Sequence, residues 1–138
     1  MPGRDPAHWL HRLSAAEWLA AADTDLAQAV EALRRRAARP GVVHARRAAG
    51  MAWNAVLVDM PEPQQARYGR SYMEHVVALA ADDGGAPDAV RAAARKLRDT
   101  PPAPPELVSI HPDLGPAEAA RVVVEHARAL VAARAANG

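Results

Sequence analysis

The sequence predicts an all-α protein, an antiparallel up-and-down bundle of about five helices. Three observations support this fold class. Apolar residues return every three or four positions through most of the chain, which is the spacing of one face of a helix. Alanine, the strongest helix former, dominates the composition. Prolines and glycines are concentrated between the periodic stretches, where they end helices, and no stretch shows the alternation of a strand.

The length of 138 residues suits one domain with a hydrophobic core. Residues 1–13 contain Pro2, Gly3 and Pro6 and predict an irregular N-terminus, whereas residues 14–138 predict a single helical-bundle domain. The chain has no cysteine, which excludes disulfides, zinc–thiolate sites and cysteine nucleophiles. The net charge of +1 gives no general attraction for nucleic acid, so an anion site must come from local clustering.

The first helix is expected after Ser14-Ala15-Ala16-Glu17, which has the spacing of a capping box. Its apolar periodicity continues to about Ala38, and Pro40-Gly41 is expected to stop it. A short turn at 39–41 then predicts an antiparallel second helix from Val42 to Met60. This second helix is rich in small residues, which permit a close approach of its neighbours.

Three further helices are expected in the second half of the chain. One runs from Tyr72 to about Asp83, after a loop over 61–68, and another begins at Pro87, a suitable first-turn residue. Residues 100–115 contain repeated prolines and predict an extended Pro-rich strap. The last helix is expected from Pro116 to about Ala135.

Several histidines and aromatic residues are candidates for binding. His8 and His11 are three residues apart and could bind a metal, and Glu17 could join them. No third ligand stands close to the two histidines at a clear spacing, so a solvated surface pair is favoured and no metal is expected. Trp18 and Trp53 lie on apolar helix faces and are expected in the core rather than stacked on bases. Trp9 is open to either interpretation. No cofactor is expected, since no Gly-rich phosphate loop follows a strand.

The densest basic cluster surrounds the first predicted turn. It comprises Arg34, Arg35, Arg36, Arg39, His44, Arg46 and Arg47. The favoured interpretation is a solvated helix end whose arginines complement the negative end of the helix dipole. The alternative is a sequence-independent contact with phosphates. In an up-and-down bundle this cluster is expected ~30 Å from the start of the third helix.

The most specific candidate site is Arg70-Ser71-Tyr72-Met73-Glu74-His75, at the start of the third helix. Ser71 and Glu74 have capping-box spacing, which places Arg70 just outside the helix and His75 near its first turn. A helix N-terminus attracts phosphate, an arginine fork binds it, and a histidine transfers protons near neutral pH. The alternative is that Arg70 pairs with Glu74 or Asp59 and His75 is an ordinary polar residue.

These residues resemble the motif of the HEPN domains, small bacterial and archaeal helical bundles with an arginine four to six positions before a histidine and a polar residue after the arginine. Two other segments are similar to that family: Trp18 followed by Asp25-Leu26 and Ala29, and the small-residue run Ala48 to Leu57. The resemblance covers about residues 14–98. Ala78 stands where many members have an aromatic residue.

The resemblance implies an RNA- or nucleotide-binding protein that uses Arg70, Ser71, Tyr72 and His75. It also implies a homodimer in which two Arg/His pairs meet. In active members such a pair cleaves RNA without metal: Arg70 would stabilise charge on the phosphate and His75 would move the proton. Many members are toxins of toxin–antitoxin systems with a small nucleotidyltransferase as partner.

The alternative function is a non-catalytic helical module for protein–protein interaction. The sequence shows neither a signal peptide nor an apolar stretch of the ~20 residues needed to cross a bilayer. A cytoplasmic protein without membrane contact is therefore expected.

Overall fold

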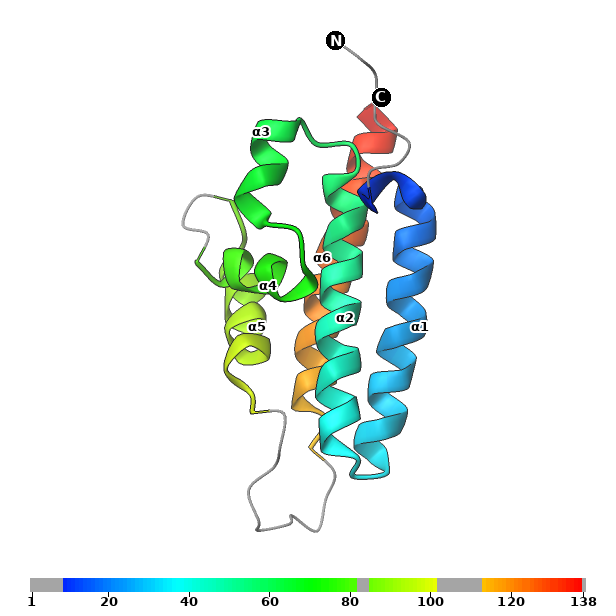
Figure 1. Ribbon diagram of the computed structural model, residues 1–138, viewed down its shortest axis with the longest axis vertical. Coiled ribbons are helices and arrows are strands. Elements are labelled where there is room, and N and C mark those ends of the chain that lie inside the picture. The colour runs from blue at the N-terminus through cyan, green and yellow to red at the C-terminus, as the bar shows by residue number, and fades with distance from the viewer. Residues whose placement is uncertain (1–8, 82–84, 102–112, 138) are drawn as a thin grey trace.

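The computed structural model describes residues 9–81, 85–101 and 113–137. In these residues the regular structure is entirely helical, which confirms the predicted all-α bundle (Figure 1). The long helices are α1 (Ala15–Arg34), α2 (Ala38–Leu57) and α6 (Gly115–Asn137), the shorter ones are α3 (Glu62–Gln65), α4 (Tyr72–Ala81) and α5 (Asp88–Asp99), and two 3-10 turns are η1 (Trp9–Arg12) and η2 (Ala66–Tyr68). None of the described helices combines the length and the apolar character needed to cross a bilayer.

Helix α2 is the centre of the bundle and contacts α1, α6 and α4. Figure 1 shows α1, α2 and α6 side by side, with α4 and α5 on the side away from α1. Every residue from Ala48 to Leu57 is buried, and the alanines at 48, 49, 52 and 55 have no exposed surface. Their small side chains let three neighbouring helices approach one backbone, as the composition of this segment predicts.

The capping box at the start of α1 forms as predicted. The Ser14 hydroxyl accepts a hydrogen bond from the Glu17 backbone N–H at 3.1 Å, and the Glu17 carboxylate accepts one from the Ser14 N–H at 2.9 Å. The prediction for the other end was wrong, because α1 ends at Arg34 rather than near Ala38. Arg36 adopts the left-handed conformation (φ 62°), and the Ala37 N–H bonds the Ala32 carbonyl at 2.8 Å. This is a Schellman ending with arginine where glycine is usual.

The pair Pro40-Gly41 therefore begins α2 instead of stopping α1. Proline is tolerated in a first turn, where its missing N–H has no partner to lose. Gly41 is needed for close packing, because a Cβ there would lie 2.4 Å from Leu33 Cδ2. The turn between the helices is accordingly at 35–37 instead of 39–41.

The segment between α2 and α4 folds back along α2. The Gln65 side-chain amide donates to the carbonyls of Leu57 and Met60, both at 2.8 Å, and fastens α3 to the end of α2. Helix α4 then starts against Gly50, where a Cβ would lie 2.3 Å from Tyr72 Cβ. Gly50 is 12 residues into α2, about 18 Å from its first residue.

The expected separation of ~30 Å between the basic cluster and the start of the third helix was therefore wrong for Arg47. That arginine lies within one turn of Gly50, where α4 begins. The estimate assumed a helix that starts at the far end of the bundle, whereas α3 and η2 return the chain to the middle of α2.

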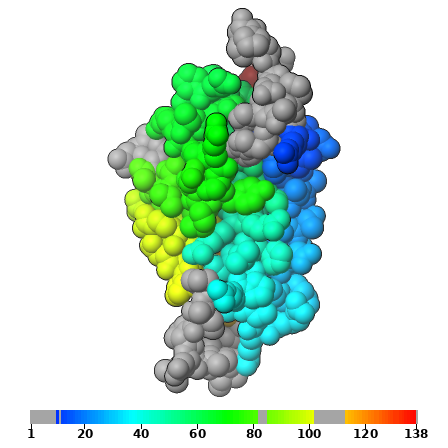
Figure 2. All heavy atoms as spheres, in the orientation of Figure 1, coloured from blue at the N-terminus to red at the C-terminus, as the bar shows by residue number. Residues whose placement is uncertain are grey.

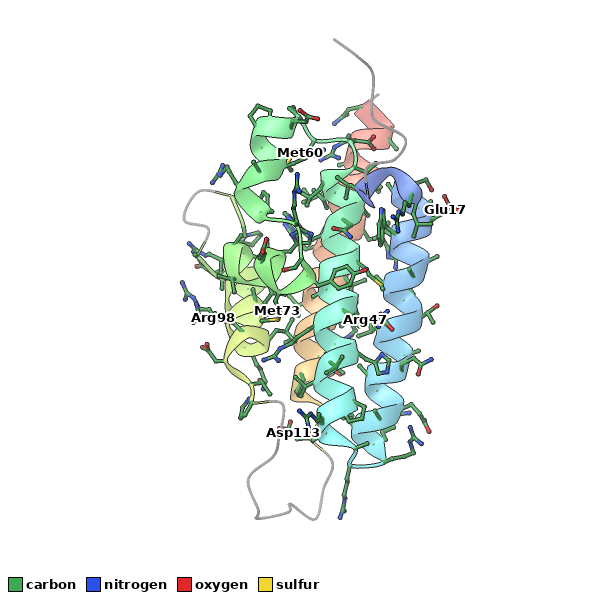
Figure 3. The ribbon with its side chains drawn as sticks, viewed as in Figure 1. Glu17, Arg47, Met60, Met73, Arg98 and Asp113 are labelled. Carbon is green, nitrogen blue, oxygen red and sulfur yellow. The ribbon has the colours of Figure 1, made fainter. Side chains whose placement is uncertain are left out.

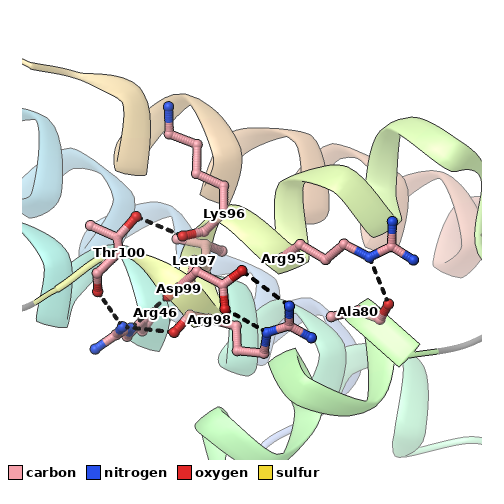
Figure 4. A network of polar contacts seen from close by, with 8 residues as sticks. All are labelled: Arg46, Ala80, Arg95, Lys96, Leu97, Arg98, Asp99 and Thr100. Atoms are coloured by element: carbon pink, nitrogen blue, oxygen red, sulfur yellow. Dashed lines mark hydrogen bonds and ion pairs between the residues drawn. The ribbon is translucent and has the colours of Figure 1, made fainter.

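Arginine side chains close the C-terminal ends of α4 and α5 (Figure 4). Arg46 of α2 donates from Nε to the Leu97 carbonyl at 2.9 Å and from Nη2 to the Thr100 carbonyl at 2.7 Å. Arg95 of α5 donates to the Ala80 carbonyl of α4 at 3.2 Å. These guanidinium groups satisfy carbonyls that have no partner within their own helix.

The start of α5 and the ends of α6 lie close to the predicted positions. Pro87 is the N-cap of α5 rather than its first residue, and α6 extends from Gly115 to Asn137. The central part of the predicted strap at 100–115 lies outside the described residues.

Candidate functional site

The start of α4 is fixed by a small network of polar contacts. The Ser71 hydroxyl accepts from the Glu74 N–H at 3.0 Å, while the Glu74 carboxylate accepts from the Arg70 N–H at 2.6 Å. The capping box therefore forms, except that Glu74 bonds the backbone N–H of Arg70 instead of that of Ser71. Gly69 makes this possible with φ 73°, and a Cβ at Gly69 would lie 2.1 Å from Glu74 Oε2.

The Arg70 side chain is exposed, and its guanidinium makes no hydrogen bond or ion pair with the part of the chain that the structure describes. Glu74 bonds the Arg70 backbone rather than its side chain, so the alternative of a guanidinium locked to Glu74 or Asp59 does not hold in this structure. Arg70 lies at an open surface pocket of about 480 Å³. The other lining residues are Leu10, Leu57, Glu62, Pro63, Gln65, Ala66 and Gly69.

His75 lies inside the protein, with no exposed surface. Its Nδ1 is 2.6 Å from the Tyr68 carbonyl, and its Nε2 is 2.7 Å from Oδ1 of Asn54 on α2. Burial lowers the pKa of His75 below its ordinary value near 6.5, against the opposing effects of the Tyr68 hydrogen bond and the Glu74 charge. The ring is therefore neutral at neutral pH.

The neutral ring constrains the orientation of Asn54. A carbonyl only accepts, so His75 Nδ1 carries the proton and Nε2 has a lone pair that needs a donor. With Oδ1 toward the ring, Asn54 Nδ2 is buried without a hydrogen-bond partner. A half-turn of the amide gives Nε2 its donor and Nδ2 its acceptor, so we assign this orientation.

The buried tryptophans Trp53 and Trp18 make contacts within the core. Trp53 packs against Tyr68 with ring centroids 5.3 Å apart and stacks on His126 at 6.1 Å. Trp18 donates from Nε1 to the Leu10 carbonyl at 2.9 Å. Trp18 and Trp53 are both buried, as predicted for core residues. His8 and the side chains of Trp9 and His11 lie outside the described residues.

Ser71 and Tyr72 complete the predicted site on its outer side. Ser71 is exposed, and Tyr72 is half-buried against Gly50. Burial raises the pKa of the Tyr72 hydroxyl; the Arg47 charge opposes this effect and the Asp25 charge adds to it. The structure thus brings Arg70, Ser71 and Tyr72 to the surface and turns His75 inward.

Asp25, His44 and Arg47 form a second polar cluster that the sequence did not single out as a site. The buried carboxylate of Asp25 on α1 bonds His44 Nδ1 at 3.1 Å and Arg47 Nε at 3.1 Å, both from α2. Figure 3 labels Arg47 on the face where α2 meets α1. The predicted basic cluster is therefore divided: Arg46 caps α5 and Arg47 binds Asp25, while the arginines nearest the turn are exposed. Those arginines are Arg34, Arg35, Arg36 and Arg39.

A signal for Asp25 was present in the helical spacing. It lies three residues after Ala22 and four before Ala29, both fully buried, so its carboxylate belongs to the inner face of α1. A carboxylate on an inner face requires a charged or hydrogen-bonding partner from the facing helix.

No family model, curated protein or solved structure matches this chain. Within the described residues, no three or more His, Asp or Glu side chains are grouped so as to hold a metal ion.

Proposed function

We propose that this chain is a HEPN-like RNA- or nucleotide-binding protein that contacts phosphate at the start of α4. The observation that carries the proposal is Arg70, whose exposed guanidinium has no partner among the described residues and lies at an open pocket. An unpaired arginine fork can give two parallel hydrogen bonds to one phosphate.

The neighbouring side chains support the same assignment. The Ser71 hydroxyl accepts from the Glu74 N–H and still has its own proton to donate. The half-buried Tyr72 ring offers a surface on which a base can stack. Glu74 already occupies the Arg70 N–H, so the contribution to phosphate binding comes mainly from side chains.

RNA cleavage by Arg70 and His75 is the narrower form of the proposal. It would make the protein a metal-independent endoribonuclease of the toxin–antitoxin type, acting as a homodimer with a nucleotidyltransferase-type partner. A catalytic histidine must reach a ribose hydroxyl or a leaving oxygen. The hydrogen bonds of His75 to Tyr68 and Asn54 would have to open first, so the geometry supports binding better than cleavage.

The burial of His75 favours one alternative, a non-catalytic helical module for protein–protein interaction. In that function His75 only stabilises the fold, and Arg70 contacts an acidic surface of a protein partner. This alternative predicts no affinity for RNA, even at low salt.

Fluorescence anisotropy with a labelled single-stranded RNA at low salt tests the proposal. Arg70→Gln should weaken binding about five- to tenfold and reduce the slope of log K against log salt by ~0.7. Arg121→Gln removes the same charge from an exposed arginine of α6 that is paired with Glu118 and Glu125, and should leave binding unchanged. Equal affinities of wild type and both variants would contradict the proposal.

The catalytic form needs a separate assay. RNA cleavage is measured with EDTA present for wild type, Arg70→Ala and His75→Ala. Loss of cleavage in both variants, with the fold retained, would support the Arg/His pair. Equal activity in all three would exclude it.

A further inference from the structure

The cluster of Asp25, His44 and Arg47 has a polar side that makes no hydrogen bond or ion pair with the described residues. The Asp25 side chain is only 10% exposed, whereas those of His44 and Arg47 are 29% and 48% exposed. His44 and Arg47 are three residues apart on α2, so they lie on one side of that helix. The cluster is thus anchored in the interior and open at the surface.

The hydrogen bonds to Asp25 determine which atoms remain available. A carboxylate only accepts, so His44 donates from Nδ1 and its Nε2 is directed away from Asp25. Arg47 donates from Nε, which leaves both terminal amino groups of its fork. Among the described residues, neither His44 Nε2 nor these amino groups have a partner.

The charges of the cluster suit a phosphate. Arg47 balances the charge of Asp25, and a His44 ring with a proton on each nitrogen would add one positive charge to the cluster. A phosphate oxygen could then accept from His44 Nε2–H and from the Arg47 fork together.

The cluster lies close to the start of α4. Arg47 is one turn from Gly50, Gly50 contacts Tyr72, and Tyr72 is two residues from Arg70. The charges of both Arg47 and Asp25 act on the Tyr72 hydroxyl, so this side chain lies near the cluster. Figure 2 shows the surface of α2 meeting that of the α3–α4 segment without a break on this face.

We propose that His44 and Arg47, positioned by Asp25, form a second phosphate-binding site that takes another phosphate of the same RNA strand or nucleotide that contacts Arg70. The identity of this ligand rests on the proposed function, but the phosphate chemistry of the site does not. Tyr72, which contacts Gly50 and is two residues from Arg70, would stack on a base of the same ligand.

Titration of the full chain with inorganic phosphate and with a short single-stranded RNA tests the site. Side-chain NMR signals of His44 and of Arg47 Nε–H should shift saturably with both ligands. Arg47→Gln and His44→Gln should each weaken binding of both ligands about tenfold. Arg47→Lys keeps the charge without the fork and should lose less affinity for both ligands than Arg47→Gln.

The matched control is Arg35→Gln. Arg35 is an exposed arginine near the first turn and is also paired with a carboxylate, Glu31, at 3.6 Å. The Arg35→Gln variant should bind phosphate and RNA as the wild type does. If Arg35→Gln weakens binding as much as Arg47→Gln, or if the His44 signals do not move, the cluster is structural only and the proposal is wrong.

The variants also separate this proposal from the proposed function. RNA binding that depends on Arg70 but not on Arg47 or His44 would contradict the second site and leave the function intact. RNA binding that depends on Arg47 and His44 but not on Arg70 would support the second site and contradict the assignment of Arg70. Circular dichroism of each variant verifies the fold, and His44→Gln, which leaves the Arg47–Asp25 pair in place, serves if Arg47→Gln does not fold.

Discussion

Two histidines, His75 and His44, make the same first hydrogen bond and differ in the second. Each donates from Nδ1 to an oxygen, the Tyr68 carbonyl for His75 and the Asp25 carboxylate for His44. The Nε2 of His75 is then taken by Asn54 inside the bundle, whereas that of His44 is directed outward. The environment of the second nitrogen, rather than a sequence motif, therefore decides which histidine can meet a ligand.

The two regions also differ in what holds them. His75 connects the segment before α4 to α2, and the ring of Tyr68 packs on Trp53 beside it. The Asp25 cluster connects α1 to α2 with charged groups that still reach solvent. One region therefore stabilises the position of α4, while the other presents the terminal amino groups of Arg47, which have no partner among the described residues.

The largest expected effect is that of His75→Ala on stability. The substitution leaves a cavity and removes a partner from the Tyr68 carbonyl and from Asn54, so the free energy of unfolding should fall by about 2–4 kcal/mol. His44→Ala is the control and should cost less than about 1 kcal/mol, because His44 is partly exposed and Asp25 keeps its bond to Arg47. Urea denaturation measures both. Similar losses in the two variants would remove the distinction between the histidines.

Gly50→Ala tests whether α4 is seated directly on α2. Helix propensity alone predicts a stabilisation of about 1 kcal/mol. The added Cβ would lie 2.3 Å from Tyr72 Cβ, so we expect instead a destabilisation of about 1–3 kcal/mol and weaker RNA binding, because Tyr72 and Arg70 are displaced. A variant more stable than the wild type in thermal denaturation would show that the contact is not close.

The pH dependence of stability reports the neutral state of His75. Its pKa is lowered in the fold by burial, so the unfolded chain binds more protons as the pH falls below about 6.5. The contribution of His75 to the free energy of unfolding should therefore be fully present above that pH, and the stability should decrease as the pH falls from 7 to 5. His126, whose pKa burial also lowers, contributes in the same direction.

His75→Gln separates these contributions. The free energy of unfolding, measured by denaturation from pH 5 to pH 7, should depend less on pH in this variant than in the wild type. His126→Gln should retain most of it, because the His126 ring is the less buried of the two. An unchanged pH dependence in His75→Gln would mean that the His75 ring is not kept neutral by the fold.

The smallest expected effect is a stabilisation at the turn that leads toward His44. Arg36 has φ 62°, a conformation that costs a residue with a Cβ about 1–2 kcal/mol and glycine almost nothing. Arg36→Gly should raise the free energy of unfolding by about 0.5–1 kcal/mol after the entropy of glycine is subtracted. Thermal denaturation measures the change, and a loss of stability would indicate that the Arg36 side chain contributes more than its backbone costs.

The helices of this protein were predictable from the sequence because their spacing of apolar residues is regular. The ends of the helices were less predictable. Pro40-Gly41 suggested a stop, but the same residues suit the first turn of α2, and the left-handed Arg36 carries no sequence signal. The return of the chain to the middle of α2 depends on Gln65, which bonds the end of α2, and on Gly50, whose contact with Tyr72 joins segments distant in the sequence.

The candidate site was predictable in position but not in orientation. Ser71 and Glu74 indicated where α4 begins, and Arg70 is exposed there. His75 lies four residues before the fully buried Leu79, so helical spacing already placed it on the inner face. Its partner Asn54 could not be inferred, because only the packing of α4 on α2 brings the two together.

The most direct test of this account is NMR of the histidine rings in the presence of RNA. His75 and His44 are assigned with the variants His75→Gln and His44→Gln, and tautomers are identified from long-range couplings to the ring nitrogens. We predict that His75 stays neutral with its proton on Nδ1 and is unchanged by saturating RNA, while the His44 signals shift. A His75 ring that shifts with RNA, beside an unmoved His44, would contradict the account.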